Sequence, residues 1–481
     1  MRKPNIVFIF SDQQRPDTMG YAGDPVAITP NLDRLACQGM VFSQCTTSSP
    51  VCMPARASMM TGYQVHQHGV WAFADPELRH GQSHVRNIRD VGYRTGVVGK
   101  THLWRHGYGH ASSHAEEMQD WGFVDAREVT GPSESLNTDS SYTDHLAAKG
   151  LLDTHRQYFE MYLKGERPFP WELPPTQLPA EDHLDRYIAE LAQQWLRDCP
   201  TEQPFYLQVN FGGPHDPWDA PNEYRSLYNA DDIPLSMNEP RSGPLSPHVQ
   251  LLLEHAPNKL HNMSAAQNRV MKSNYYSKVT LIDDCVGRIV NKLEQLNILD
   301  NTWIVFSSDH GEMLGDHGLL AKKVFYDGAV TVPCLFRPPQ NKKSDASSEP
   351  ASSQAKSMNS SLTCHLDVAA TLVDICGAAP LQDSDGRSVL PQLRGEQTGP
   401  HRSAVLAELG LPPSAFMMVR TDQHKLCVDA INRQPIEQYD LGADPNELHN
   451  LIDNPAYAKL RGELINDVLA PMLSTLDTNA W

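Results

Sequence analysis

The sequence is poor in cysteine and contains no long hydrophobic run. Its 481 residues include nine cysteines. None of them forms a CxxC pair, so neither a disulfide framework nor a zinc ribbon is expected. No apolar stretch approaches the roughly 18 residues that a membrane-spanning helix needs. The N-terminal apolar run, residues 6–10, is shorter than the roughly 7–15 apolar residues of a signal peptide, so we expect a cytoplasmic protein.

Basic residues are also scarce. The chain has 40 Lys and Arg residues against 58 Asp and Glu residues, which gives a net charge of −18 with histidine neutral. This acidic balance argues against nucleic acid and against an anionic membrane as partners. It does not exclude a small anionic substrate, because the charge of a local pocket can oppose the net sign.

Strand-like and helix-like segments alternate along most of the chain. Short apolar runs are typical of strands buried on both faces, and segment 265–295 repeats apolar residues every three to four positions, as a helix does. The predicted strands are residues 5–10, 94–99, 205–211 and 302–307, and the predicted helices are 29–39, 265–295 and 365–377. We expect Thr29 to cap the first helix. The alternation predicts an α/β fold in which helices sandwich a large, mostly parallel sheet.

The composition changes after residue 339. Residues 340–361 are rich in Ser and Lys and have almost no apolar content, which predicts a mobile surface loop. Beyond residue 396 the alternation of strands and helices stops. We therefore predict a catalytic α/β domain over residues 1–396 and a smaller α+β subdomain over 397–481.

The C-terminal subdomain has its own pattern. Residues 416–420 and 424–428 are predicted to pair as antiparallel strands around a short turn. Residues 456–469 are predicted to form a terminal helix that stops before Pro471, because proline disfavours helix at the residue before it.

Two predicted strands end in acidic motifs. Residues 6–10 lead into Asp12 and Gln13, and the strand near 302–307 leads into Asp309 and His310. Ligand sites of doubly wound sheets lie beyond the carboxyl ends of the strands, so these four side chains would meet. Two carboxylates and an amide oxygen suit a hard divalent cation, and one imidazole also admits Mn²⁺. For either segment alone, the alternative is an Asp that only caps a turn.

A third feature is the segment 48–62. Cys52 would lie near the N-terminus of a short helix that Gly62 can end, where backbone N–H groups favour negative charge. Arg56 follows one turn later on the same face. The pattern predicts a nucleophile or an anion site beside a fixed guanidinium, and the alternative is a buried structural cysteine.

These residues resemble a known signature. Cys52, Pro54 and Arg56, followed by Ala57-Ser58 and Thr61-Gly62, are similar to the motif of the type I, formylglycine-dependent sulfatases of the alkaline phosphatase superfamily. The resemblance continues in order through Asp12 and residues 29–33, 99–102, 214–217, 308–312, 322, 439–441, 444–445 and 450–451. It covers nearly the whole chain and implies hydrolysis of a sulfate ester.

The resemblance also implies a nucleophile and a metal. Cys52 would be oxidised to formylglycine by a maturation enzyme, and the hydrate of that aldehyde would attack sulfur. One divalent cation is implied, Ca²⁺ in preference to Mn²⁺. Its implied ligands are Asp12, Gln13, the hydrate derived from Cys52, Asp309 and His310.

The remaining motif residues receive roles from the same resemblance. Arg56 would hold the nucleophile, while Lys100 and Lys322 would bind sulfate oxygens and offset charge in the transition state. His215 would protonate the leaving oxygen, alone or together with Lys322. His102 would then remove a proton from the sulfated hemiacetal, which expels sulfate and regenerates the aldehyde.

Two metal residues depart from the pattern of many sulfatases. Gln13 stands where many carry Asp, and His310 stands where many carry Asn. Both variants occur in branches that resemble phosphonate monoester and phosphodiester hydrolases, so such an activity with the same nucleophile is one alternative. A noncatalytic metal- or anion-binding protein with unmodified Cys52 is another.

Substrate selectivity is less well indicated. The candidates for substrate contact are Trp104, Arg105, His106 and Trp218. His106, His110 and His114 have i,i+4 spacing, but the glycines between them predict a polar loop rather than a second metal site. The expected substrate is a sulfated carbohydrate or a small aryl or alkyl sulfate. The acidic surface favours small or oligomeric substrates over highly sulfated polymers.

Overall fold

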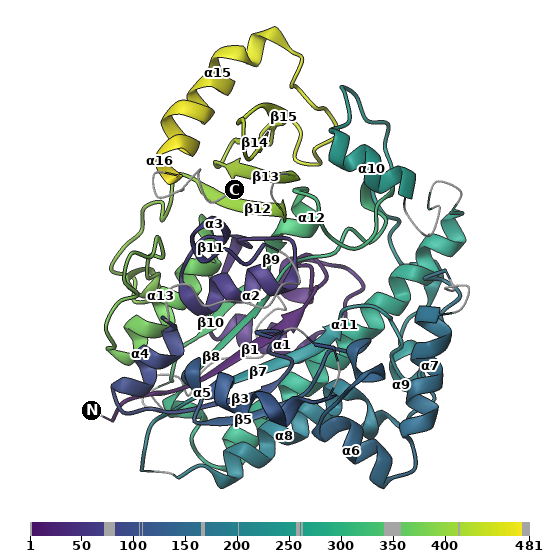
Figure 1. Cartoon of the computed structure of the whole chain (residues 1–481), viewed down its shortest axis with the longest axis vertical. Helices are drawn as coiled ribbons and strands as arrows, with labels where there is room; N and C mark the ends of the chain where they lie inside the picture. The colour runs from purple at the N-terminus through teal and green to yellow at the C-terminus, as the bar shows by residue number, and fades with distance from the viewer. Residues whose placement is uncertain are drawn as a thin grey trace.

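The computed structural model describes residues 2–71, 82–104, 106–107, 109–164, 169–200, 202–255, 260, 263–340, 357–411 and 414–473. A large sheet with helices on both faces forms the body of the molecule, and a small sheet lies at one end of it (Figure 1). Within the described residues, every helix is too short or too polar to span a lipid bilayer.

The large sheet has nine strands in the order β11-β2-β10-β8-β1-β7-β3-β5, with β9 paired to β2. The strands are β1 (Asn5–Asp12), β2 (Met40–Thr46), β3 (Arg94–Gly99), β5 (Asp125–Glu128), β7 (Phe205–Pro214), β8 (Thr302–Ser308), β9 (Thr331–Val332), β10 (Cys334–Arg337) and β11 (Met358–Cys364). The run from β8 to β5 is parallel, and β2 is parallel to β11, whereas β10 is antiparallel to both β8 and β2. The prediction of a mostly parallel α/β sheet is confirmed.

The helices are α1 (Pro30–Cys37), α2 (Cys52–Thr61), α3 (Val65–His68), α4 (His84–Asp90), α5 (Ala115–Asp120), α6 (Ser141–Ala148), α7 (Leu152–Lys164), α8 (Leu184–Asp198), α9 (Asn222–Arg225), α10 (Pro247–His255), α11 (Ala265–Gln295), α12 (Asp327–Val330), α13 (His365–Cys376), α14 (Leu390–Leu393), α15 (Ala458–Glu463) and α16 (Ala470–Met472). Most of them pack around the large sheet, whereas α15 and α16 lie against the small sheet (Figure 1). A separate two-stranded pair joins β4 (Gly109–His110) to β6 (Thr138–Asp139).

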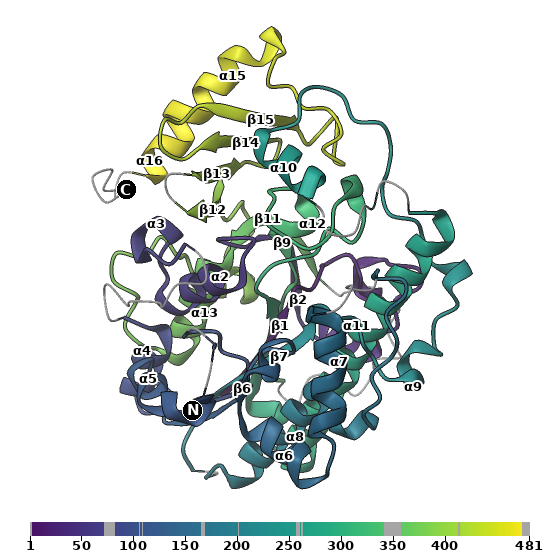
Figure 2. The ribbon, with the colours of Figure 1, turned by 45° about the vertical axis from the view of Figure 1, so that its right-hand side comes forward.

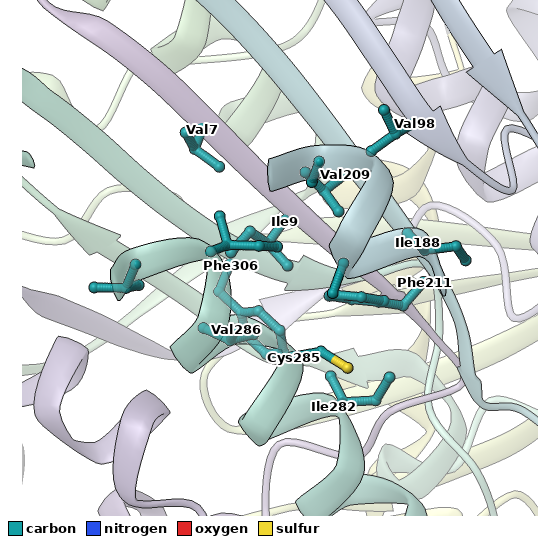
Figure 3. Packing of buried hydrophobic residues seen from close by; sticks show 14 of the residues in the cluster. Val7, Ile9, Val98, Ile188, Val209, Phe211, Ile282, Cys285, Val286 and Phe306 are labelled. Atoms are coloured by element: carbon teal, nitrogen blue, oxygen red, sulfur yellow. The ribbon is translucent and has the colours of Figure 1, made fainter. Parts of the chain in front are cut away.

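Strand β1 is buried along its whole length because its two faces serve two different cores. Val7 and Ile9 pack with side chains of α8 and α11 (Figure 3). Phe8 and Phe10 point the other way and pack with α2, α4 and α13. An uninterrupted apolar run is therefore the pattern that a central parallel strand needs.

Helix α1 begins without the predicted cap. Thr29 makes no capping hydrogen bond, because its hydroxyl donates to Asp33 and accepts from the main-chain N–H of Gly20. The carboxylate of Asp283 on α11 takes over instead and accepts from the N–H groups of Asn31 and Leu32, at 3.1 and 2.7 Å. The cap is thus a tertiary contact.

The small sheet is antiparallel, in the order β12-β13-β14-β15. Its strands are β12 (Val405–Leu411), β13 (Ser414–Arg420), β14 (His424–Asp429) and β15 (Pro435–Asp440). The two strands predicted over residues 416–420 and 424–428 lie within β13 and β14 and pair as expected. Figure 2 shows this sheet above α2 and α3.

The terminal helix runs further than predicted. Helix α15 continues through a π-helical segment, Leu464–Leu469, into α16, so Pro471 lies inside the helical run and the prediction that it stops before this residue is wrong. Pro471 occupies the first turn of α16, where a missing N–H is tolerated.

The predicted loop over residues 340–361 is only partly covered by the structure. Residues 341–356 lie outside the described residues. Residues 358–361 belong to β11, so the loop prediction is wrong there. These polar residues form a strand because their main chain pairs with β2 at the sheet edge. The boundary between residues 396 and 397 stays a prediction.

Candidate active site

The two acidic motifs meet at the carboxyl edge of the large sheet, as expected. Asp12 is the last residue of β1, and Asp309 and His310 directly follow β8. The two strands are parallel neighbours, with Ser11 paired to Ser308. One ligand atom from each of Asp12, Asp309 and His310 lies within 4.8 Å of the others, and all three side chains are fully buried.

This cluster has unpartnered atoms that could act as metal ligands. Asp12 Oδ2 accepts from Lys100 Nζ at 2.7 Å, but Oδ1 has no hydrogen-bond partner among the described residues. His310 Nδ1 donates to the Gly311 carbonyl at 2.9 Å, which leaves the lone pair of Nε2 similarly unpartnered within the described chain. Oδ1 and Nε2 are 3.9 Å apart. Buried, unsatisfied acceptors that face one another fit a divalent cation.

Gln13 lies in the same site. Its main-chain N–H donates to Asp309 Oδ1 at 3.0 Å, and it adopts a positive φ of 66°. Its amide oxygen accepts from Lys322 Nζ at 2.9 Å, while its amide nitrogen donates to Glu312. The main chain of Gln13 thus contacts the acidic cluster, and its side chain is held between Lys322 and Glu312.

Cys52 is the first residue of α2 and is buried. Gly62 ends this helix with φ 73°, as predicted. Burial opposes ionisation of the Cys52 thiol, but the neighbouring Lys322, His310 and Lys100 outweigh it, so the pKa lies below the ordinary thiol value. A cysteine surrounded by charged groups is typical of a reactive position rather than of an inert core.

Arg56 connects the nucleophile helix to both acidic motifs. Its Nε donates to Asp309 Oδ2 at 2.9 Å, and Nη2 donates to Asp12 Oδ2 at 3.2 Å. Nη1 donates to the carbonyl of Lys100 at 2.7 Å. The guanidinium also lies 5.1 Å from the centre of the Phe10 ring. Arg56 therefore fixes three separate segments of the site.

Lys100 and His102 follow β3 and are both buried. Burial opposes the charged form of Lys100, but Asp12 and Glu134 raise its pKa above the ordinary value, so the ammonium persists. Burial and the Lys100 charge lower the pKa of His102 to about 3. A neutral imidazole at this place can accept a proton.

His215 and Lys322 complete the group. His215 follows β7, and its Nδ1 donates to the carbonyl of Asp216 at 2.7 Å. Burial and the neighbouring Lys322 lower the pKa of His215. The ammonium of Lys322 lies 4.0 Å from Cys52 Sγ. All the predicted metal and catalytic residues therefore face one site.

The candidates for substrate contact are placed differently. Trp104 is 3% exposed, donates to Glu128 at 2.7 Å and stacks on His114. Trp218 is equally buried and meets Tyr275 edge to face. This burial favours a packing role for both indoles over contact with substrate, because the apolar ring surface is used in the core.

The histidines near residue 106 do not form a second metal site. His106 stacks on His102 with 4.9 Å between ring centres, whereas His114 stacks on Trp104 and His110 contacts Ser112. Across the described residues, the acidic cluster above is the one group of His, Cys, Asp and Glu side chains arranged for a metal. Arg105 lies outside the described residues.

Three further residues contact the site, and the sequence by itself indicated no role for any of them. Glu134 faces Lys100 and His102, which outweigh its burial and lower its pKa to about 2. Burial raises the pKa of Glu312, which accepts from Gln13, to about 7. Tyr275 on α11 donates to the carbonyl of Gln13 at 2.9 Å. Each is distant in sequence from its partner, so spacing alone carries no signal for it.

Comparisons with known proteins agree with this geometry. The sulfatase family model matches residues 4–378, and the model of the C-terminal part of N-sulphoglucosamine sulphohydrolase matches residues 315–472. Choline-sulfatase of Rhizobium meliloti is 28% identical over 475 residues, which cover 94% of this chain and 83% of the relative. N-acetylglucosamine-6-O-sulfatase of Bacteroides thetaiotaomicron is 25% identical over 493 residues, covering 96% of this chain and 85% of the relative.

The solved structures show the same fold. The crystal structure of phosphonate monoester hydrolase of Agrobacterium radiobacter superposes with a TM-score of 0.78 at 22% identity, over 97% of this chain and 95% of the other. The two chains therefore share one fold over nearly their whole lengths. Because a family model matches most of its length and the buried site holds the family's motifs, the chain belongs to the sulfatase family and is a sulfuric ester hydrolase.

Proposed function

We propose that the protein hydrolyses the sulfate ester of a small or oligomeric carbohydrate, or a small aryl or alkyl sulfate, with a formylglycine hydrate derived from Cys52. The observation that carries this proposal is the position of Cys52. The thiol lies at the start of α2 beside the ammonium of Lys322, next to the unpartnered donor atoms of Asp12 and His310. The hydrate would occupy the place of this thiol, and its formation needs a maturation enzyme.

The metal would be held by Asp12, Gln13, Asp309 and His310. When bound, the cation supplies positive charge that favours the ionised form of the nucleophilic hydroxyl. Oxygen atoms dominate this donor set, which supports Ca²⁺ in preference to Mn²⁺. Arg56 holds the two carboxylates in place and leaves Asp12 Oδ1 directed at His310.

The remaining groups act on the sulfate and the departing alcohol. Lys100 and Lys322 bind the sulfate oxygens and offset the charge of the transition state, because transfer of a charged tetrahedral group depends mainly on positioning and electrostatics. His215 donates a proton to the leaving oxygen, and the adjacent sulfate anion favours its charged form. Neutral His102 then accepts the hydroxyl proton of the sulfated hemiacetal, which expels sulfate.

Two measurements test this proposal. Peptide mass spectrometry of protein made together with a formylglycine-generating enzyme should find formylglycine at position 52. The Cys52→Ala variant should keep the unfolding temperature of the wild type and lose turnover of 4-nitrophenyl sulfate. Wild-type activity in this variant would contradict the proposal. Cys376→Ala, which changes a buried thiol at the end of α13, is the matched control and should stay active.

A phosphonate monoester or phosphodiester hydrolase is the second candidate. Gln13 favours it, because a neutral amide in place of a carboxylate leaves a more positive metal site. The comparison of kcat/KM for 4-nitrophenyl sulfate with that for bis-4-nitrophenyl phosphate separates the two. A large excess for the phosphodiester would replace the sulfate ester as the main substrate.

A further inference from the structure

A buried group of charged side chains lies behind the segment that carries His215. It consists of Lys278 on α11, Asp185 on α8, Asp219 and His183, and none of the four is more than 6% exposed. Lys278 Nζ is 3.1 Å from Asp219 Oδ1 and 3.4 Å from Asp185 Oδ2. It is also 3.2 Å from His183 Nε2. None of these residues belongs to the site described above.

This group ties down both ends of the His215 segment. Asp185 Oδ1 accepts from the main-chain N–H groups of Gly212 and Gly213, at 2.9 and 3.0 Å. At the other end of the segment, Asp219 bonds Lys278 through its side chain. Residues 212–219 are thus held at two points against α8 and α11.

The fit at the first anchor is tight. A Cβ atom on Gly213 would lie 2.8 Å from Asp185 Oδ2 and 3.2 Å from Lys278 Cε, so the main chain approaches the two side chains as closely as a glycine permits. The apolar residues around it leave little freedom as well, since Phe211, Ile188 and Ile282 share the core shown in Figure 3. The segment therefore has one well-defined path.

Burying charged side chains to hold a segment costs desolvation free energy. A buried ion pair stabilises a fold no better than apolar packing of the same volume. Its hydrogen bonds are directional, however, and they fix the main chain at a defined distance, which apolar contacts do not. Burial opposes the charged form of Lys278, but Asp219 and Asp185 raise its pKa above the ordinary value, so the ammonium persists.

We infer that Lys278, together with Asp185 and Asp219, is a positioning group for the leaving-group side of the site. It holds residues 212–219 so that the imidazole of His215 meets the departing oxygen. The same helix serves the metal side, because Tyr275 bonds the carbonyl of Gln13. The inference rests on the proposed function, in which His215 donates the proton.

A displaced proton donor has a specific kinetic consequence. Phenolate is a more basic leaving group than 4-nitrophenolate and depends more on protonation as the S–O bond breaks. Loss of positioning should therefore slow phenyl sulfate more than 4-nitrophenyl sulfate. A general loss of folded protein would slow both by the same factor.

The test uses the charge-balanced variant Lys278→Gln with Asp219→Asn, in the full-length, matured protein. We expect kcat/KM for phenyl sulfate to fall about tenfold more than that for 4-nitrophenyl sulfate, which is less than the roughly 10²–10⁴-fold that a general acid contributes in full. His215→Ala should show the same preference. Combining the changes should add little to the loss from His215→Ala, since both act on one proton transfer. If the double variant folds poorly, the single change Asp219→Asn takes its place. We expect it to show the same preference between the two substrates, but a smaller one.

The pair Lys425→Gln with Glu447→Gln is the matched control. It removes a buried ion pair between β14 of the small sheet and the segment after β15, and it should slow both substrates equally. Equal losses for the two substrates in the Lys278 variant would overturn the inference alone, as would a further large loss in the His215→Ala background. A matured wild-type protein that cleaves neither sulfate would instead overturn the proposed function.

Discussion

Arg56 shows at the scale of single residues why the site needs a guanidinium. Three of its nitrogens donate to three different segments, and its planar fork matches their directions. A lysine has one nitrogen on a flexible stem and cannot reach all three acceptors. The role of Arg56 is therefore geometric as well as electrostatic.

We predict that Arg56→Lys lowers kcat/KM for 4-nitrophenyl sulfate by about a hundredfold or more, the scale of losing one preorganised donor. Because Asp12 and Asp309 lose their shared partner, Ca²⁺ affinity measured by calorimetry should fall too. Arg402→Lys is the control, since Arg402 makes a similarly buried pair with Asp367 outside the site. Unchanged Ca²⁺ affinity in Arg56→Lys would contradict the structural argument.

The buried carboxyl group of Glu128 makes the stability of the fold depend on pH. Its carboxylate accepts from Trp104 and Thr101, yet burial outweighs these bonds and raises its pKa from 4.5 to about 7. The folded state therefore binds the proton more tightly than the unfolded state. The stability that the protonated form contributes is present below about pH 4.5 and is lost as the pH rises through 7.

The Glu128→Gln variant stays neutral at every pH and should escape this loss. Relative to the wild type, its free energy of unfolding should improve by up to about 3 kcal/mol between pH 4.5 and pH 8. Urea unfolding at both pH values measures the change, with Glu239→Gln on the surface as the control. A difference that does not vary with pH would refute the assigned shift.

Helix α11 is the element that organises the site. Its 31 residues present Tyr275 to the metal side, Lys278 to the His215 segment and Asp283 to the start of α1. These side chains lie on the face that packs against the rest of the fold. A long, rigid helix thus sets the relative position of three separate loops.

The cap that Asp283 provides for α1 can be tested directly. Asp283→Ala leaves two main-chain N–H groups of α1 without their acceptor, so we expect a loss of about 1–3 kcal/mol in the free energy of unfolding. Glu294→Ala removes an exposed contact between the same two helices, with Arg34, and should change stability by less than about 0.5 kcal/mol. Equal effects of the two substitutions in urea unfolding would contradict the capping role.

Local sequence predicted most of the elements. The bounds of α11 and β3 agree with the predicted ranges 265–295 and 94–99, because hydrophobic periodicity and short apolar runs report burial directly. The edge strand β11 was missed because its first residues are polar, and main-chain pairing with β2 leaves no trace in composition. The end of the terminal helix was missed because a π-helical segment precedes Pro471.

At the scale of the whole molecule, the small sheet contacts the segment that leads into Cys52. The N–H of Glu408 on β12 donates to the carbonyl of Ser48 at 2.9 Å, and Val51 packs with Ala407 and Leu409 of the same strand. Glu408 also accepts from the ring of His66 after α2. The C-terminal sheet therefore supports the loop that presents Cys52, although it contributes none of the predicted catalytic residues.

The net charge of the whole molecule affects how polyanionic substrates approach it. The net charge of −18 repels a polyanion, whereas the cationic groups of the site act only at short range. We predict that kcat/KM for a long sulfated polysaccharide rises as salt increases from low to physiological ionic strength. The value for 4-nitrophenyl sulfate should change far less. A polysaccharide rate that falls with salt would show that a local basic surface guides the polymer.

The sequence by itself determined where the acidic motifs lie: residues at the ends of parallel strands meet at one edge of the sheet, so Asp12 and Asp309 could be placed together from their order alone. The role of Cys52 came instead from the resemblance to the sulfatases. Only the tertiary structure decided how these residues are held. Tyr275 and Lys278 act on residues far away in the chain, and the indole of Trp104 is packed in the core rather than at a pocket edge. Local pattern reports burial and turns, but it does not report which distant side chain satisfies a given buried polar group.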